Sequence, residues 1–76
     1  MDADIRVNLR NVIRDRGCVQ ATIAKRSNLS AAKFSQILKL ERKLEANELF
    51  DICAAINMTP MELKEYEPIL QEEMQD

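Results

Sequence analysis

Residues 20–38 read QATIAKRSNLSAAKFSQIL, and this stretch carries the strongest structural signals of the chain. Its first part predicts a short helix from about Gln20 to Arg26, with Ile23 and Ala24 facing inward. The segment 27–29, Ser-Asn-Leu, then interrupts this helix, because asparagine tolerates the left-handed backbone that a sharp turn needs. The pattern therefore predicts a helix that stops abruptly at a tight turn.

A second helix is predicted directly after the turn. Ser30 is a favourable N-cap, since its hydroxyl can accept a hydrogen bond from an otherwise unsatisfied backbone N–H of the first turn. The helix is expected to run from Ala31 to about Lys39. Three apolar residues at helical spacing form its inward stripe: Phe34, Ile37 and Leu38.

A longer amphipathic helix is expected before this pair. Four apolar residues recur there at spacings i, i+4, i+7 and i+8, namely Ile5, Leu9, Val12 and Ile13. Asp4 or Asp2 can cap the start of this helix, and Gly17 can end it as a left-handed residue.

A fourth helix is predicted from about Ala46 to Ile56, after the charged connector 41–44, and Asn57 can end it. Its inward residues are expected to be Leu49, Ile52, Cys53 and Ile56.

A fifth, short helix has a strong start signal. Thr59 is suited to the N-cap, Pro60 to the first helical position, and Glu62 to the third position of a capping box. We expect this helix to end near Tyr66, and one further helical turn can run over residues 68–71.

These elements predict a compact all-α fold with five helices, or six if the turn over 68–71 forms. The 76 residues contain one glycine, two prolines and 4% aromatic residues, which favours helices over sheets. The expected organisation is a single domain over 1–76, with a core at about 4–66 and an acidic C-terminal tail or short helix at 67–76.

The charge is divided unevenly along the chain. Residues 5–44 contain ten Lys and Arg and only two acids, whereas residues 45–76 contain nine acids and one lysine. The overall net charge of −2 hides this division. A local positive field is sufficient to attract the phosphates of a nucleic acid.

Catalysis and metal binding find little support in the residue types. The chain has no histidine, and it has no Gly-rich phosphate loop or nucleophile paired with a base. Cys18 and Cys53 lie 35 positions apart and cannot complete a tetrahedral metal site. We expect free thiols in a reducing cytoplasm, no cofactor, no bound metal, no small-molecule ligand and no enzymatic activity.

The stretch from about Leu9 to Leu63 resembles the phage repressor and Cro-type helix-turn-helix family, also called the xenobiotic-response-element (XRE) family. The ordered set that carries the resemblance is Gln20, Ile23, Ala24, Asn28, Leu29, Ser30, Phe34, Ile37, Leu49, Ile56, Asn57, Met58, Thr59 and Leu63. The resemblance implies a five-helix, lambda-repressor-like DNA-binding domain whose third helix lies in the major groove.

Three positions depart from the pattern of that family. The family often has an arginine near the end of the first helix and a glutamate near the end of the third, whereas this chain has Ile13 and Leu38. We expect an apolar contact in place of the ion pair, because the joint change leaves no buried charge unpaired. Leu40 stands where the family often has the glycine that ends the third helix, so that helix either runs longer or ends differently.

By resemblance, the residues that read base edges are Ala31, Ala32, Lys33 and Gln36. Gln36 can bond adenine, Lys33 can bond guanine or a phosphate, and the alanines can contact thymine methyl groups. Two alanines imply a modest direct readout with more weight on DNA shape. The other interpretation is that the alanines only favour the helix and that Gln36 is a solvated polar residue.

Phosphate contacts are expected from a second set of residues: Gln20, Ser35, Lys39, Arg42 and Lys43. Arg6, Arg10 and Arg14 form a stripe on the first helix, which is either a solvated face or a DNA contact. The same two interpretations are open for Lys25 and Arg26.

The expected function is that of a sequence-specific, duplex-DNA-binding transcriptional regulator of the repressor type, located in the cytoplasm. The resemblance implies a homodimer on a near-palindromic site. Candidate dimer residues are Met58, Met61, Tyr66, Ile69, Leu70 and Met74. The alternative is a helix-turn-helix scaffold that binds another protein, as an antitoxin or anti-repressor would, and the acidic C-terminal third favours it.

Overall fold

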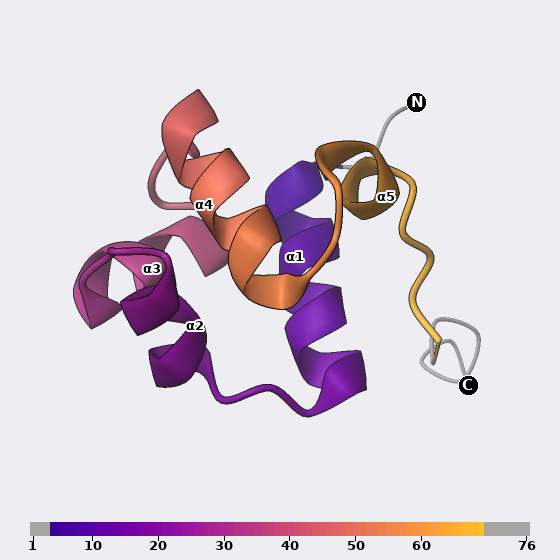
Figure 1. Ribbon diagram of the computed structural model, residues 1–76, viewed down its shortest axis with the longest axis horizontal. Coiled ribbons are helices and arrows are strands. Elements are labelled where there is room, and N and C mark those ends of the chain that lie inside the picture. The colour runs from indigo at the N-terminus through magenta and orange to yellow at the C-terminus, as the bar shows by residue number, and fades with distance from the viewer. Residues whose placement is uncertain (1–3, 70–76) are drawn as a thin grey trace.

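The computed structural model describes residues 4–69, and these form five α-helices with no strand among them (Figure 1). The helices are α1 (Ile5–Arg16), α2 (Gln20–Arg26), α3 (Ala31–Leu38), α4 (Ala46–Ile56) and α5 (Pro60–Lys64). The all-α, five-helix fold expected from the sequence is confirmed, and so are the predicted bounds of α2 and α4.

Two helices end earlier than predicted. The helix α3 ends at Leu38 rather than Lys39, and α5 ends at Lys64 rather than near Tyr66. Pro68 and Ile69 are not helical. The rest of the additional helical turn expected over 68–71 lies outside the described residues.

The core forms where α1 packs against α3 and α5, and where α2 packs against α3 and α4. Its buried apolar residues come from all five helices and are Leu9, Val12, Ile13, Ile23, Ala24, Phe34, Ile37, Leu38, Ile52, Cys53, Ile56 and Leu63. The residues predicted to face inward from helical spacing are all buried, except for Ile5 and Leu49, which are half-buried at the edge of the core.

The N-caps follow the predicted side-chain chemistry. The Asp4 carboxylate accepts from the Arg6 backbone N–H at 2.9 Å, and the Ser30 hydroxyl accepts from that of Lys33 at 3.1 Å. Thr59 and Glu62 form a reciprocal capping box with bonds of 3.0 and 2.8 Å. These bonds satisfy donors that helix geometry leaves without partners.

The first four helices all end in the same way. In each, a left-handed residue follows the last turn: Gly17, Asn28, Leu40 and Asn57, with φ between 59° and 68°. The backbone N–H of the next residue donates to a carbonyl five positions earlier, as from Glu41 to Gln36 at 2.8 Å. This is the Schellman motif, which satisfies the last carbonyls of a helix.

Leu40 is the one member of this set that is neither glycine nor asparagine, and α3 therefore ends through a leucine at φ 64°. A Cβ in this conformation crowds the following carbonyl. We expect Leu40→Gly to be about 1 kcal/mol more stable than Leu40→Ala, since both variants lose the side chain and only glycine relieves the crowding. Thermal unfolding would show the difference as ~4–8 °C in Tm.

A matched pair at Lys33, an exposed residue inside α3, should give the opposite order, because glycine is unfavourable in a helix interior. If alanine were the better residue at both positions, the left-handed strain assigned to Leu40 would be absent.

Two side chains of α1, Asn8 and Asp15, join the two ends of the described chain. Asn8 in α1 is 3% exposed, and its side-chain NH₂ donates to the carbonyls of Leu63 at 3.0 Å and Lys64 at 2.9 Å. Asp15 accepts from the Tyr66 hydroxyl at 2.7 Å and from the Ile69 N–H at 3.0 Å. The Ile69 N–H and then the Tyr66 hydroxyl hold the pKa of Asp15 below its usual value. These contacts attach α5 and the segment after it to α1.

Candidate nucleic-acid interface

The helices α2 and α3 meet through the turn 27–30, at the left of Figure 1. Ser27 is buried in this turn, and its hydroxyl donates to the Ile23 carbonyl at 2.7 Å. Asn28 takes the left-handed conformation that the sequence predicts, with φ 59°. The two helices, the turn and the helix that precedes them have the arrangement of a helix-turn-helix unit.

The helix α3 presents a clear inner and outer face. Phe34, Ile37 and Leu38 are buried, while Ala32 and Gln36, one turn apart, lie on the opposite side and are exposed. Ala31 and Lys33 flank them and are also exposed. The four residues expected to read base edges therefore share the solvent side of α3.

Gln20 lies beside this outer face. A cavity of about 220 Å³ between the first turns of α2 and α3 is lined by Gln20, Ala21, Ala24, Ala31 and Phe34. The residue expected to bind a phosphate and the first residue expected to read a base thus border one hollow, at the amino ends of the two helices.

The connector 39–45 supplies the cations next to α3. Lys39 and Lys43 are exposed, and their ammonium groups have no acceptor within residues 4–69. Arg42 differs, because its guanidinium donates to Glu48 of α4 at 3.1 Å. Ser35 is half-buried on the flank of α3. Among the cations expected to contact phosphates, Lys39 and Lys43 are therefore more available than Arg42.

Glu48 organises the charge at the start of α4. The Glu45 backbone N–H, which donates to it at 3.0 Å, and then Arg42 and Lys33 hold the pKa of Glu48 below its usual value. Lys33 therefore lies within electrostatic range of this carboxylate.

The three arginines of the α1 stripe were open to two interpretations, and the structure gives each an acceptor within the chain. Arg14 donates to the Asp15 carboxylate at 3.1 Å. Arg6 donates to the Arg42 carbonyl at 3.0 Å, and Arg10 donates to the Leu38 carbonyl at 3.2 Å. These contacts could not be found from sequence, because they depend on how α1 lies against the connector.

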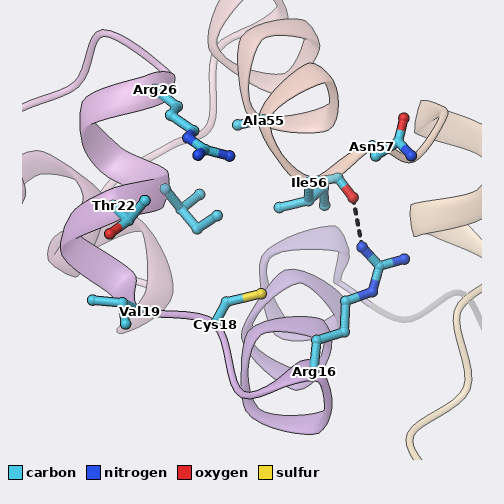
Figure 2. Close-up of a pocket in the computed structure, with 9 residues that line it drawn as sticks. Arg16, Cys18, Val19, Thr22, Arg26, Ala55, Ile56 and Asn57 are labelled. Atoms are coloured by element: carbon cyan, nitrogen blue, oxygen red, sulfur yellow. Dashed lines mark hydrogen bonds between the residues drawn. The ribbon is translucent and has the colours of Figure 1, made fainter.

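The other side of α2 borders a second cavity, of about 290 Å³, between the end of α1 and the end of α4 (Figure 2). Figure 2 shows the Cys18 sulfur pointing into the space between α2 and Ile56, with the Arg16 guanidinium donating to the Ile56 carbonyl. None of the residues expected to read bases or bind phosphates lines this cavity, although Arg26, which was open to a DNA contact, does.

The two thiols should differ strongly in reactivity. Cys18 is half-buried at the cavity, whereas Cys53 is 3% exposed in the core and burial raises its pKa. We expect a disulfide reagent to modify Cys18 in the native protein at least about 100-fold faster than Cys53, because Cys53 must wait for an opening of the fold. Cys18→Ser and Cys53→Ser separate the two rates, and the rates should converge in denaturant. Equal native rates would contradict the burial of Cys53.

Two short helices joined by a tight turn, with an exposed outer face and adjacent lysines, define a helix-turn-helix DNA-binding protein. The chain belongs to the Cro/C1-type HTH DNA-binding domain family, whose model matches residues 8–68. The resemblance stated from the sequence is thereby confirmed, and membership identifies the chain as a DNA-binding transcriptional regulator.

Solved structures share the fold. The chain is similar to the DNA-binding domain of the P22 c2 repressor, with a TM-score of 0.77 and 20% identity over 86% of this chain and 87% of that one. It is similar to the restriction-modification controller protein C.AhdI from Aeromonas hydrophila, with a TM-score of 0.72 and 22% identity over 78% and 89% of the two chains. The clp gene regulator ClgR from C. glutamicum gives a TM-score of 0.73 and 19% identity over 78% and 77%.

No curated protein sequence matches the chain. Within residues 4–69, every helix is too short or too polar to cross a membrane.

Proposed function

We propose that the chain acts in the cytoplasm as a homodimeric, repressor-like regulator that binds a near-palindromic duplex without a cofactor. In this proposal α3 enters the major groove, where Ala31, Ala32, Lys33 and Gln36 face base edges. The phosphate contacts come from Gln20, Ser35, Lys39, Arg42 and Lys43. The single observation that carries the proposal is the exposed outer face of α3, beside two lysines that have no acceptor within residues 4–69.

The homodimer rests on apolar side chains that remain exposed. Met61 and Ile69, two of the dimer residues suggested from the sequence, are exposed. Phe50, which was not suggested, is exposed as well. Met58 and Tyr66 instead pack against the chain's own core, and this use weakens them as dimer contacts. Leu70 and Met74, also suggested, lie outside the described residues.

Selection of bound duplexes from a random library tests the proposal. We expect an enriched palindrome with half-sites about one helical turn, roughly 34 Å, apart, and a log K that falls linearly with log salt. Enrichment of no sequence, together with capture of a protein partner through the acidic C-terminal third, would replace the proposal with the protein-binding alternative.

Two substitutions separate the proposed roles on the enriched duplex. Gln36→Ala should cost ~1–3 kcal/mol and relax the preference at one base pair, because it removes a base contact. Lys43→Ala should weaken all sequences alike and reduce the salt slope by about 1, because it removes a phosphate contact. Identical effects of the two variants would contradict the assigned roles.

A further inference from the structure

The connector 39–45 carries two exposed lysines, Lys39 and Lys43, that have no acceptor within residues 4–69, yet it has no regular structure of its own beyond the end of α3. Such a segment is expected to fluctuate unless other elements hold its backbone. Two arginine side chains of α1 hold it. Arg10 donates to the Leu38 carbonyl at 3.2 Å, and Arg6 donates to the Arg42 carbonyl at 3.0 Å.

The spacing of the donors and acceptors of these two bonds shows which peptide units are held. The Leu38 carbonyl belongs to the peptide unit that joins Leu38 to Lys39, and the Arg42 carbonyl belongs to the unit that joins Arg42 to Lys43. Arg6 and Arg10 are four residues apart, one helical turn, and their acceptors are also four residues apart. Each arginine therefore holds the peptide unit directly before one of the two exposed lysines.

Further contacts hold both partners of the Arg6–Arg42 bond. The Asp4 carboxylate takes two hydrogen bonds from Arg6, at 3.0 and 2.7 Å, and leaves the third guanidinium nitrogen for the connector. On the other side Arg42 bonds Glu48, whose carboxylate also accepts from the Glu45 N–H at 3.0 Å. The connector is thus hydrogen-bonded to α1 through Arg6 and to α4 through Arg42. Each of these guanidinium groups is itself held by a carboxylate.

We infer that Arg6 and Arg10 are positioning residues for DNA binding, which hold the backbone that carries Lys39 and Lys43 beside α3, where both lysines meet phosphates. Neither arginine touches the DNA in this inference. Both act through the backbone of the connector, and they do so in a domain where the paired positions Ile13 and Leu38 carry no ion pair to fasten the end of α3 to α1.

The inference rests on the proposed function, and Arg10→Met tests it while keeping the apolar stem of the side chain. On the enriched duplex we expect the dissociation constant to rise about tenfold, with the salt slope unchanged, because no phosphate contact is lost. On a duplex of scrambled sequence we expect less than a twofold change, because non-specific binding does not require the lysines to be ordered in one position, and both can still reach phosphates. Lys43→Ala is the matched comparison, with a slope reduced by about 1.

Two results would overturn the inference. A slope reduced by about 1 in Arg10→Met would make Arg10 a direct phosphate contact. An equal loss on the enriched and scrambled duplexes would mean that the variant is only less folded.

Hydrogen exchange without DNA distinguishes failure of this inference from failure of the proposed function. In Arg10→Met we expect the Leu40 and Glu41 amides to exchange about tenfold faster, with the amides of α4 unchanged. Arg26→Met is the control, since Arg26 lies on α2 and makes no side-chain hydrogen bond or ion pair within residues 4–69. Unchanged exchange at Leu40 and Glu41 would mean that Arg10 does not hold the backbone of the connector, whatever the chain binds.

Discussion

Asn8→Asp should destabilise the domain by about 3–5 kcal/mol at pH 7, enough to unfold a large fraction of a small protein. The side chain is 3% exposed and donates both amide hydrogens to the carbonyls of Leu63 and Lys64. An aspartate of the same shape would place an anion against two carbonyl oxygens at the end of α5. Denaturant unfolding monitored by circular dichroism measures the loss.

The pH dependence provides the control for this variant. A buried carboxyl facing carbonyls has its pKa raised in the folded state, so the folded state binds more protons than the unfolded state between the two pKa values. The stability of Asn8→Asp should therefore rise as the pH falls from 7 towards 4. Asn8→Leu also removes both donors but cannot titrate, and its loss should be smaller and independent of pH. A flat pH profile for Asn8→Asp would contradict the burial of Asn8.

The second large effect is expected at the contact region of α1 and α3. Ile13 is 8% exposed and Leu38 is 5% exposed, and both belong to one buried cluster. Ile13→Arg should cost about 3–5 kcal/mol, because it leaves a buried charge without a partner. Ile13→Met is the matched control for an unbranched side chain, and it should cost less than about 1.5 kcal/mol.

Adding Leu38→Glu to Ile13→Arg should recover much of this loss, because it restores the ion pair that the family resemblance implies at these positions. The four proteins of the double-mutant cycle should give a coupling free energy of about 2 kcal/mol or more. A coupling near zero would mean that the two side chains do not face each other, and the apolar replacement of the ion pair would have to be abandoned.

The helices of this protein follow from short-range physical chemistry, and for that reason the sequence predicts them well. Periodic apolar residues set which side of each helix is buried, as Phe34 and Ile37 do for α3. Caps such as Ser30, and the left-handed Gly17 and Asn57, set the ends within a residue or two. The end of α3 was predicted less exactly, because leucine does not favour the left-handed conformation that Leu40 adopts there.

The outer face of α3 was also accessible from sequence, since burial of Phe34, Ile37 and Leu38 leaves Ala32 and Gln36 outside by helical geometry alone. What remained out of reach depends on contacts between residues distant in the chain. In the sequence, Asn8 looks like any other polar residue of a helix. Only the packing of α5 against α1 shows that its amide is buried and donates to a carbonyl 55 positions away.

The basic side chains likewise show what the sequence determines and what depends on tertiary contacts. Composition and spacing determined that the first part of the chain is basic and carries an exposed helix beside lysines. Only the tertiary structure decided which cations remain available, because a guanidinium is long enough to turn either to solvent or to a carbonyl of a neighbouring element. Arg6, Arg10 and Arg42 donate to acceptors 36, 28 and 6 residues away, while Lys39 and Lys43 have no acceptor within residues 4–69.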